Sequence, residues 1–180
     1  MFRALRRPKQ ALPQEECEAI LQRGETCVLA LAGDDGYPYA VPVNYCYAEG
    51  KVYIHCAKEG HKLDAVRRDS KASLTVIDRA QVLPEEYSTH YRSVIAFGRM
   101  RILEDEGEMR RALSLFAARL APKESEEARL REIDRWFSSV SVLEFTPEHI
   151  SGKQSLSFLE SIHRPNTLSP LRTPRSLTSE

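Results

Sequence analysis

Four side chains that can bind an anion or transfer a proton lie close together in the chain: His55, Cys56, His61 and Lys62. They follow an alternating apolar segment typical of a strand and lead into helix-forming residues. His61 and Lys62 then fall in the first helical turn, after Gly60, where backbone N–H groups lack partners and the helix dipole is positive. Free N–H groups beside a lysine suit a phosphate. The segment therefore predicts an anion site at a strand-to-helix junction.

The same residues have plainer interpretations. Lys62 could be a solvated lysine on an exposed helix face, and His55 could be an ordinary surface histidine. A metal site is not predicted, because zinc needs about four ligands and no second cluster accompanies these residues. His55 and Cys56 are neighbours on a strand and point to opposite faces, which argues against a Cys–His nucleophilic pair.

The composition is that of one ordinary globular domain. The chain has 180 residues, of which 42% are hydrophobic and 29% charged, and its 26 basic residues balance its 26 acidic ones. This balance argues against general nucleic-acid binding, and the apolar runs are too short to span a membrane. The basic N-terminus lacks the apolar core of a secretory signal. Four cysteines without a Cys-x-x-Cys pair predict free, mostly buried thiols in a reducing, cytoplasmic compartment (Cys17, Cys27, Cys46 and Cys56).

Periodicity and turn residues predict six strands and four helices. Strands are expected over residues 26–32, 37–47, 51–56, 71–77, 91–103 and 140–145. Helices are expected over residues 13–24, 61–69, 106–120 and 125–136. Residues 33–36 should form a hairpin turn, and residues 78–89 an irregular loop. Pro38 and Pro42 place their strand at a sheet edge or a bulge. Trp136 is expected to pack the late helices against the sheet.

Six strands with hairpin connections predict a small barrel that is mainly β with helices. A doubly wound sheet would alternate strand and helix throughout, whereas only one crossover helix, over residues 61–69, lies early in this chain. The domain is expected to span residues 1–160. Residues 161–180 are rich in Ser, Thr, Pro and Arg and predict a flexible C-terminal tail.

Three segments carry a resemblance to a known family: Gly36–Tyr45, His55–Leu63 and Tyr91–Gly98. In this order and spacing they resemble the pyridoxamine 5′-phosphate oxidase-like FMN-binding split barrels, and within them the 5-nitroimidazole resistance (Nim) branch. The segment Glu148–Lys153 is similar to the ending of that branch. The resemblance covers about residues 5–160 and implies a homodimer of six-stranded split barrels, with FMN in two clefts between the subunits.

The resemblance also implies roles for individual residues. Lys62 and His61 match the basic phosphate ligands, and Cys56 stands where many members place a hydroxyl group, which is a stronger hydrogen-bond partner than a thiol. Ser93 matches a flavin contact that is expected to come from the partner subunit. His55 matches a histidine near the flavin or substrate cleft and is the candidate catalytic residue. The backbone along the flavin ring is implied to be that of Val41, Pro42, Val43, Asn44 and Tyr45.

The resemblance implies an oxidoreductase in which FMN passes electrons from NADH or NADPH to a small acceptor such as a nitroaromatic. Since the chain has no GxGxxG fingerprint, the nicotinamide should bind transiently. Vitamin B6 synthesis is not expected, because the arginine that vitamin-forming oxidases carry at the Val41 position and their C-terminal motif are absent. The alternatives are a non-catalytic module that holds a flavin, deazaflavin or haem, and a dimeric interaction protein.

Overall fold

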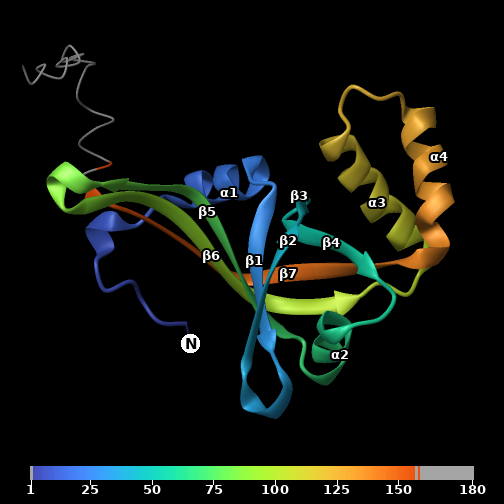
Figure 1. Ribbon diagram of the computed structural model, residues 1–180, viewed down its shortest axis with the longest axis horizontal. Helices are drawn as coiled ribbons and strands as arrows, with labels where there is room; N and C mark the ends of the chain where they lie inside the picture. Colours follow the sequence, from blue (N-terminus) through green and yellow to red (C-terminus); the bar gives the residue numbers. More distant parts are fainter. Residues whose placement is uncertain (1, 157, 159–180) are drawn as a thin grey trace, which may run out of the picture.

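A single antiparallel sheet dominates the computed structural model, which describes residues 2–156 and 158 (Figure 1). The fold is mainly β with helices, as predicted. The strands follow the order β2-β1-β5-β6-β7-β4-β3. Their bounds are β1 Thr26–Ala32, β2 Pro38–Asn44, β3 Cys46–Ala48, β4 Lys51–Ala57, β5 Lys71–Leu83, β6 Ser88–Ile102 and β7 Val140–Gln154. In the described part of the chain, no helix is long and apolar enough to cross a membrane.

The sheet has seven strands in the described residues, so the strand number of the predicted six-stranded split barrel is corrected. The expected strand over residues 37–47 breaks at Tyr45 into β2 and β3, which lie at opposite edges of the sheet. Because one residue joins the two edges, the sheet must roll until they meet there. No hydrogen-bonded ladder joins β2 to β3 in the described residues, so the barrel stays split. The prolines of β2 lie on an edge strand, as predicted.

The described residues form four α-helices. They are α1 Gln14–Arg23, α2 His61–Arg68, α3 Glu106–Leu120 and α4 Glu126–Trp136. Of these, α1, α2 and α3 contact the sheet and α4 packs against α3. The side chains of Asp105 and Ser125 cap α3 and α4 by accepting the N–H groups of Glu108 and Ala128. Figure 1 shows α3 and α4 side by side where β4 ends and β7 begins, away from α1. Short 3-10 turns occupy Pro8–Gln10, Asp34–Gly36, Pro84–Glu86 and Phe137–Ser139.

The central strands bury alternate residues, as a half-buried sheet requires. One face of β1, β5 and β6 forms the core with Leu29, Leu74 and Val94, none of which is exposed. Three of the four cysteines are buried and all four are free thiols, as predicted. The opposite face of the same strands leaves large apolar side chains in solvent, among them Val28 and Phe97.

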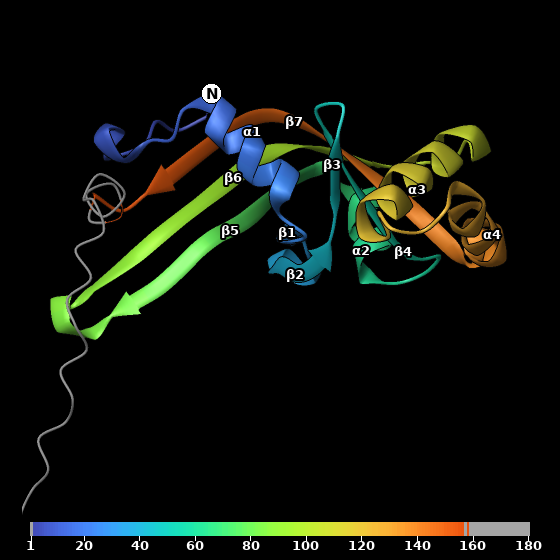
Figure 2. The ribbon, with the colours of Figure 1, turned by 90° about the horizontal axis from the view of Figure 1, so that it is seen from above.

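Two predicted boundaries were wrong. The expected loop over residues 78–89 is a hairpin, because β5 and β6 resume pairing after a bulge and continue from Arg79↔Arg92 to Leu83↔Ser88. Figure 2 shows this hairpin extending away from the rest of the sheet. Its alternation is weak because most of its side chains are exposed. The last strand runs nine residues past Phe145. A second bulge opposite Gly98 accommodates Pro147 and keeps β7 paired to β6. The predicted tail over residues 161–180 lies outside the described residues.

Candidate functional site

The strand-to-helix junction has the geometry that an anion site needs. The chain leaves β4 at Ala57 and enters α2 through Gly60, whose φ of 129° is a backbone conformation that favours glycine. The N–H groups of Leu63 and Asp64 donate to the Gly60 carbonyl. Those of His61 and Lys62 have no acceptor among the described residues. The first turn of α2 therefore presents two free donors and the positive end of the helix dipole.

Lys62 is half-buried beside Cys56, and no acidic side chain in the described part of the chain forms an ion pair with it. Burial raises the pKa of the Cys56 thiol, while the charge of Lys62 opposes that rise. Cys56 is therefore a neutral thiol at pH 7. A lysine without an acidic partner at a helix N-terminus fits a phosphate, so the donor set suits FMN.

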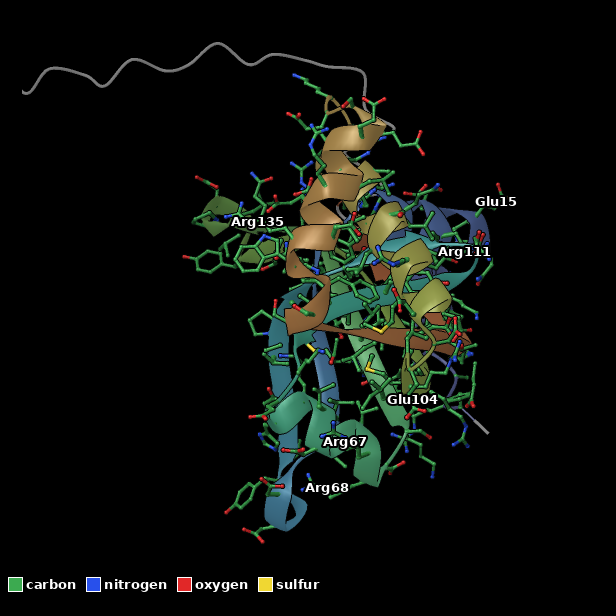
Figure 3. All side chains as sticks on the ribbon, turned by 90° about the vertical axis from the view of Figure 1, so that its right-hand side faces the viewer. Glu15, Arg67, Arg68, Glu104, Arg111 and Arg135 are labelled. Atoms are coloured by element: carbon green, nitrogen blue, oxygen red, sulfur yellow. The ribbon has the colours of Figure 1, made fainter. Side chains whose placement is uncertain are left out.

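His61 already has protein partners. Its ring stacks on Tyr39 of β2 with the centroids 4.0 Å apart, and its Nε2 lies 3.4 Å from Oδ2 of Asp34. Arg68 also donates to Asp34 and, at 3.3 Å, to the carbonyl of Ala32. Hydrogen bonding from Arg68 holds the pKa of Asp34 below its ordinary value. These contacts, which we call the Asp34 latch (Asp34, His61 and Arg68), tie the β1–β2 turn to α2; Figure 3 labels Arg68.

The predicted ring-binding segment is mostly an open edge. Val41 and Val43 pack against the core, while Pro42 and Asn44 are exposed. β2 pairs with β1 on one side only, so its other backbone edge is free within the described residues. Tyr45 differs from its neighbours, because its side chain is fully buried and its Oη donates to the carbonyl of Leu21 at 2.7 Å. Its side chain is therefore a core element.

His55 lies on the other side of β4 from Cys56. Its ring meets Phe116 of α3 edge-on at 4.6 Å, and burial lowers the pKa of His55 below its ordinary value. The imidazole faces a groove of about 610 Å³ between α3 and α4. The structure thus groups His61, Lys62 and Cys56 with β2 in one region, which we call the β2–α2 corner, and places His55 in the α3–α4 groove.

Ser93 lies far from the corner within one chain. It pairs with Ile77 of β5 and with Lys153 near the end of β7, whereas Cys56 pairs with Ser141 at the start of β7. The twelve steps along β7 from Ser141 to Lys153 correspond to about 40 Å of strand at the rise of extended backbone. Figure 2 shows β7 running from the α3–α4 end to the opposite end of the sheet. Within one chain, Ser93 and Cys56 therefore lie toward opposite ends of β7.

Sequence reasoning missed several residues of both regions. Tyr39, Asp34 and Arg68 come from separate elements, so only the fold brings them to His61. Trp136 does not pack against the sheet as expected, because it is 50% exposed and lines the groove, with its Nε1 donating to Glu132 at 2.6 Å. The helical spacing predicted α3 and α4 as elements, but it could not show that a groove lies between them.

Comparison with known proteins now places the chain in a family. The family model described as pyridoxamine 5′-phosphate oxidase matches residues 13–154, which include every strand of the sheet. The chain belongs to the pyridoxamine 5′-phosphate oxidase family. This is a flavin-binding family, and the match spans both the β2–α2 corner and the α3–α4 groove.

Solved structures share the fold at low sequence identity. A candidate 5-nitroimidazole antibiotic resistance protein from Bacteroides thetaiotaomicron is 23% identical, with a TM-score of 0.64 and coverage of 80% of this chain and 86% of that one. A conserved hypothetical protein from Mycobacterium tuberculosis is 18% identical, with a TM-score of 0.71 and coverages of 83% and 90%. A flavocytochrome from Azotobacter vinelandii is 22% identical, with a TM-score of 0.68 and coverages of 97% and 89%. No curated protein matches the chain.

Proposed function

We propose that the protein is an FMN-dependent oxidoreductase. The observation that carries the proposal is Lys62 in the first turn of α2, which has no acidic partner among residues 2–156 and 158 and lies next to N–H groups that have no acceptor there. Lys62 and these N–H groups bind the phosphate of FMN, and the His61 ring adds a further donor when it leaves Asp34. Cys56 lies beside them as a weak partner. Membership of a flavin-binding family supports the same ligand.

The free edge of β2 lies along the flavin ring. The backbone of Val41, Pro42, Val43 and Asn44 orients the ring, and Tyr45 fixes the end of this segment to the carbonyl of Leu21. When bound, the flavin supplies two-electron redox chemistry. The protein binds the flavin, orients it and shields it from water.

A homodimer completes the cofactor site. Ser93 and Cys56 lie toward opposite ends of β7 in one chain, so on this proposal Ser93 contacts a flavin that is bound to a second copy. An apolar sheet face supports such an interface: Val28 and Ile95 share a cross-strand row through Thr75, and Phe97 follows on the same face. These three side chains are 37–40% exposed, which is unusual for neighbouring large apolar groups on a monomer. Residues 1–160 would form the repeated domain.

His55 is the catalytic residue of the proposal. The protonated imidazole donates a proton to the acceptor as it is reduced, and the neutral ring that remains takes a new proton from solvent. The electrons come from NADH or NADPH and pass to a small acceptor such as a nitroaromatic. Four reduced cysteines suit the cytoplasm. Because a flavocytochrome is among the structural neighbours, the alternative is a haem-binding or non-catalytic module.

Absorbance and size measurements test the proposal directly. The purified protein should show flavin absorbance, release FMN on denaturation and elute as a dimer. Anaerobic addition of NADH or NADPH should bleach the flavin, and a nitroaromatic should restore its colour. A haem Soret band in place of flavin absorbance would favour the alternative. A colourless monomer that fails to bind added FMN would refute the proposal.

A further inference from the structure

The α3–α4 groove has the size and lining of a binding site for a small molecule. Its volume of about 610 Å³ lies within the range of ligand pockets in proteins. Val140 and His55 form its floor at the ends of β7 and β4. Its walls are mainly apolar and come from Leu113, Phe116, Ala117 and Leu120 of α3 and from Ala128, Ile133 and Trp136 of α4. Figure 3 shows the two helices from this end, with Arg111 and Arg135 on opposite flanks.

Two large apolar side chains of the groove are left in solvent. Leu120 is 52% exposed and Trp136 is 50% exposed, whereas Phe116 beneath them is 4% exposed. A ligand that lies between α3 and α4 removes apolar surface of both side chains from water. The rings of Phe116 and Trp136 suit a flat partner, because aromatic groups prefer stacked or edge-on contacts.

His55 is the hydrogen-bonding group of the floor. Its imidazole makes no side-chain hydrogen bond or ion pair among residues 2–156 and 158, and its contact with Phe116 is through the ring. A neutral imidazole carries one N–H donor and one lone pair. Since an N–H that faces an apolar wall loses the hydrogen bonds of water, it favours a ligand with an acceptor oxygen. A carbonyl oxygen is a stronger acceptor than a nitro oxygen.

The charges at the rim favour an uncharged ligand. Glu124 and Glu132 contribute two carboxylates, and Arg129 contributes one guanidinium. Arg129 already donates through Nη1 to the carbonyls of Ala121 and Glu124, at 3.2 and 2.8 Å. Glu132 pairs with Arg135 at 3.7 Å, so the charges at the rim balance and Arg129 and Arg135 are both engaged. Among the described residues, such a rim offers no free cation to an acidic ligand or to the two propionates of haem.

We propose that the α3–α4 groove binds an uncharged planar carbonyl compound of the quinone class, whose oxygen accepts a hydrogen bond from His55. The inference rests on the proposed function in one respect: if the protein is a flavin-dependent oxidoreductase, the quinone is the acceptor of its electrons. The groove and the β2–α2 corner share the end of β4, with His55 facing one and Cys56 the other. Binding itself needs no flavin, so a failure of the groove is distinguishable from a failure of the flavin site.

Trp136 provides a direct reporter, because it is the only tryptophan of the chain. The full-length protein as purified is titrated with 2,3-dimethyl-1,4-naphthoquinone while tryptophan fluorescence is followed. Both ring carbons that a thiol could attack carry methyl groups, so Cys56 cannot form an adduct. We expect saturable quenching, whereas a free tryptophan derivative should show only linear, collisional quenching. Linear quenching of the protein as well would overturn the proposal.

Two neighbouring alanines supply a matched pair of variants. Ala117 lines the groove, whereas Ala118 lines a separate depression on the other side of the helix pair. Ala117→Phe should fill the groove and weaken quinone binding at least tenfold, and Ala118→Phe should leave it unchanged. Thermal melts followed by circular dichroism establish that both variants fold. Equal binding by the two variants would overturn the assignment to this groove.

A second pair tests the hydrogen bond. His55→Phe keeps a ring against Phe116 but removes the N–H, so quinone affinity should fall roughly twofold to tenfold, as for one neutral hydrogen bond. His90→Phe, on β6 outside the groove, is the control and should bind as the wild type does. Unchanged affinity in His55→Phe would remove His55 from the site. Haemin that binds with a Soret band lost in His55→Phe would overturn the uncharged ligand class.

Discussion

The two sides of the last residues of β4 face different chemical environments. Cys56 faces the β2–α2 corner, where Lys62 and the Asp34 latch gather charge at the start of a helix. His55, one residue earlier, faces the α3–α4 groove, which is mainly apolar. Alternation along a strand produces this difference, since adjacent side chains point to opposite faces. One strand end can therefore serve an anionic cofactor on one side and an uncharged ring on the other.

The largest expected effect comes from Phe116→Ala, which removes the buried ring that joins α3 to β4. The change should lower the free energy of unfolding by about 3–5 kcal/mol, through lost burial and the cavity that remains. Urea unfolding measures this loss. If the two sides of β4 are independent, the folded variant should bind FMN as the wild type does. A loss of FMN binding free energy larger than the loss of unfolding free energy would show that the α3–α4 groove supports the β2–α2 corner.

His55→Ala should slow the reduction of the acceptor by roughly 10²-fold or more, as for a lost proton donor, while FMN and the dimer are retained. Stopped-flow reoxidation of the reduced protein gives the rate. His55→Gln separates proton transfer from hydrogen bonding, because glutamine donates a hydrogen bond but does not titrate. If both variants react at the wild-type rate between pH 5.5 and 8, His55 has no catalytic role.

The sequence predicted most of the elements and the location of the corner. The alternation over residues 51–56 and the helix formers after Gly60 correctly placed His61 and Lys62 in a first helical turn. The opposite orientations of His55 and Cys56 also followed from their adjacency. Tyr45 was not recognised as a break, because apolar and polar residues alternate on both sides of it and only the rolled sheet separates β2 from β3.

The environment of each candidate residue could not be predicted in the same way. Asp34 lies 27 positions before His61, and no local pattern couples a turn to a distant helix. The groove is also a tertiary feature, since the spacing of apolar residues in α3 and α4 indicates a buried face but not how closely the faces meet. Residues 78–89 pair as a hairpin that has no buried face, so apolar and polar residues do not alternate in this part of the sequence.

Glu144→Gln tests the charged hydrogen bonds that hold α3 against the sheet on the side of the α3–α4 groove. Burial opposes ionisation of Glu144, but donors from Arg101 and Lys51 outweigh it and lower the pKa. Arg101 also donates to Glu108 of α3. Because the pKa is lower in the folded state, the stabilisation is present above the unfolded pKa and is lost as pH falls through the folded pKa.

The free energy of unfolding of the variant should therefore be lower than that of the wild type by about 2 kcal/mol at pH 7, as for charged hydrogen bonds. This difference in stability should disappear below about pH 4, where the carboxylate is protonated. Urea unfolding at pH 7 and pH 3 gives both values. Glu148→Gln, which breaks an exposed pair with Arg99, is the control and should cost less than about 1 kcal/mol. A gap that persists at pH 3 would assign the effect to packing.

The smallest effect is expected from the Asp34 latch. Asp34→Asn removes a carboxylate that competes for His61 and repels a phosphate, so FMN affinity should rise roughly twofold to fivefold, as for an exposed ion pair. Isothermal titration with FMN measures the change. Asp64→Asn, which breaks the exposed pair with Arg67 on the same helix, should leave the affinity nearly unchanged. A fall in affinity for Asp34→Asn would mean that the latch holds His61 in place for the phosphate.

The central claim is that Lys62 binds the cofactor phosphate at the start of α2, and one pair of titrations tests it most directly. Wild type and Lys62→Ala are each titrated with FMN and with riboflavin, which has the same ring but no phosphate. We predict that FMN affinity falls about tenfold to a hundredfold, as for a charge-assisted contact, and that riboflavin affinity does not change. Equal FMN affinity in both proteins, or an equal loss for both ligands, would contradict the claim.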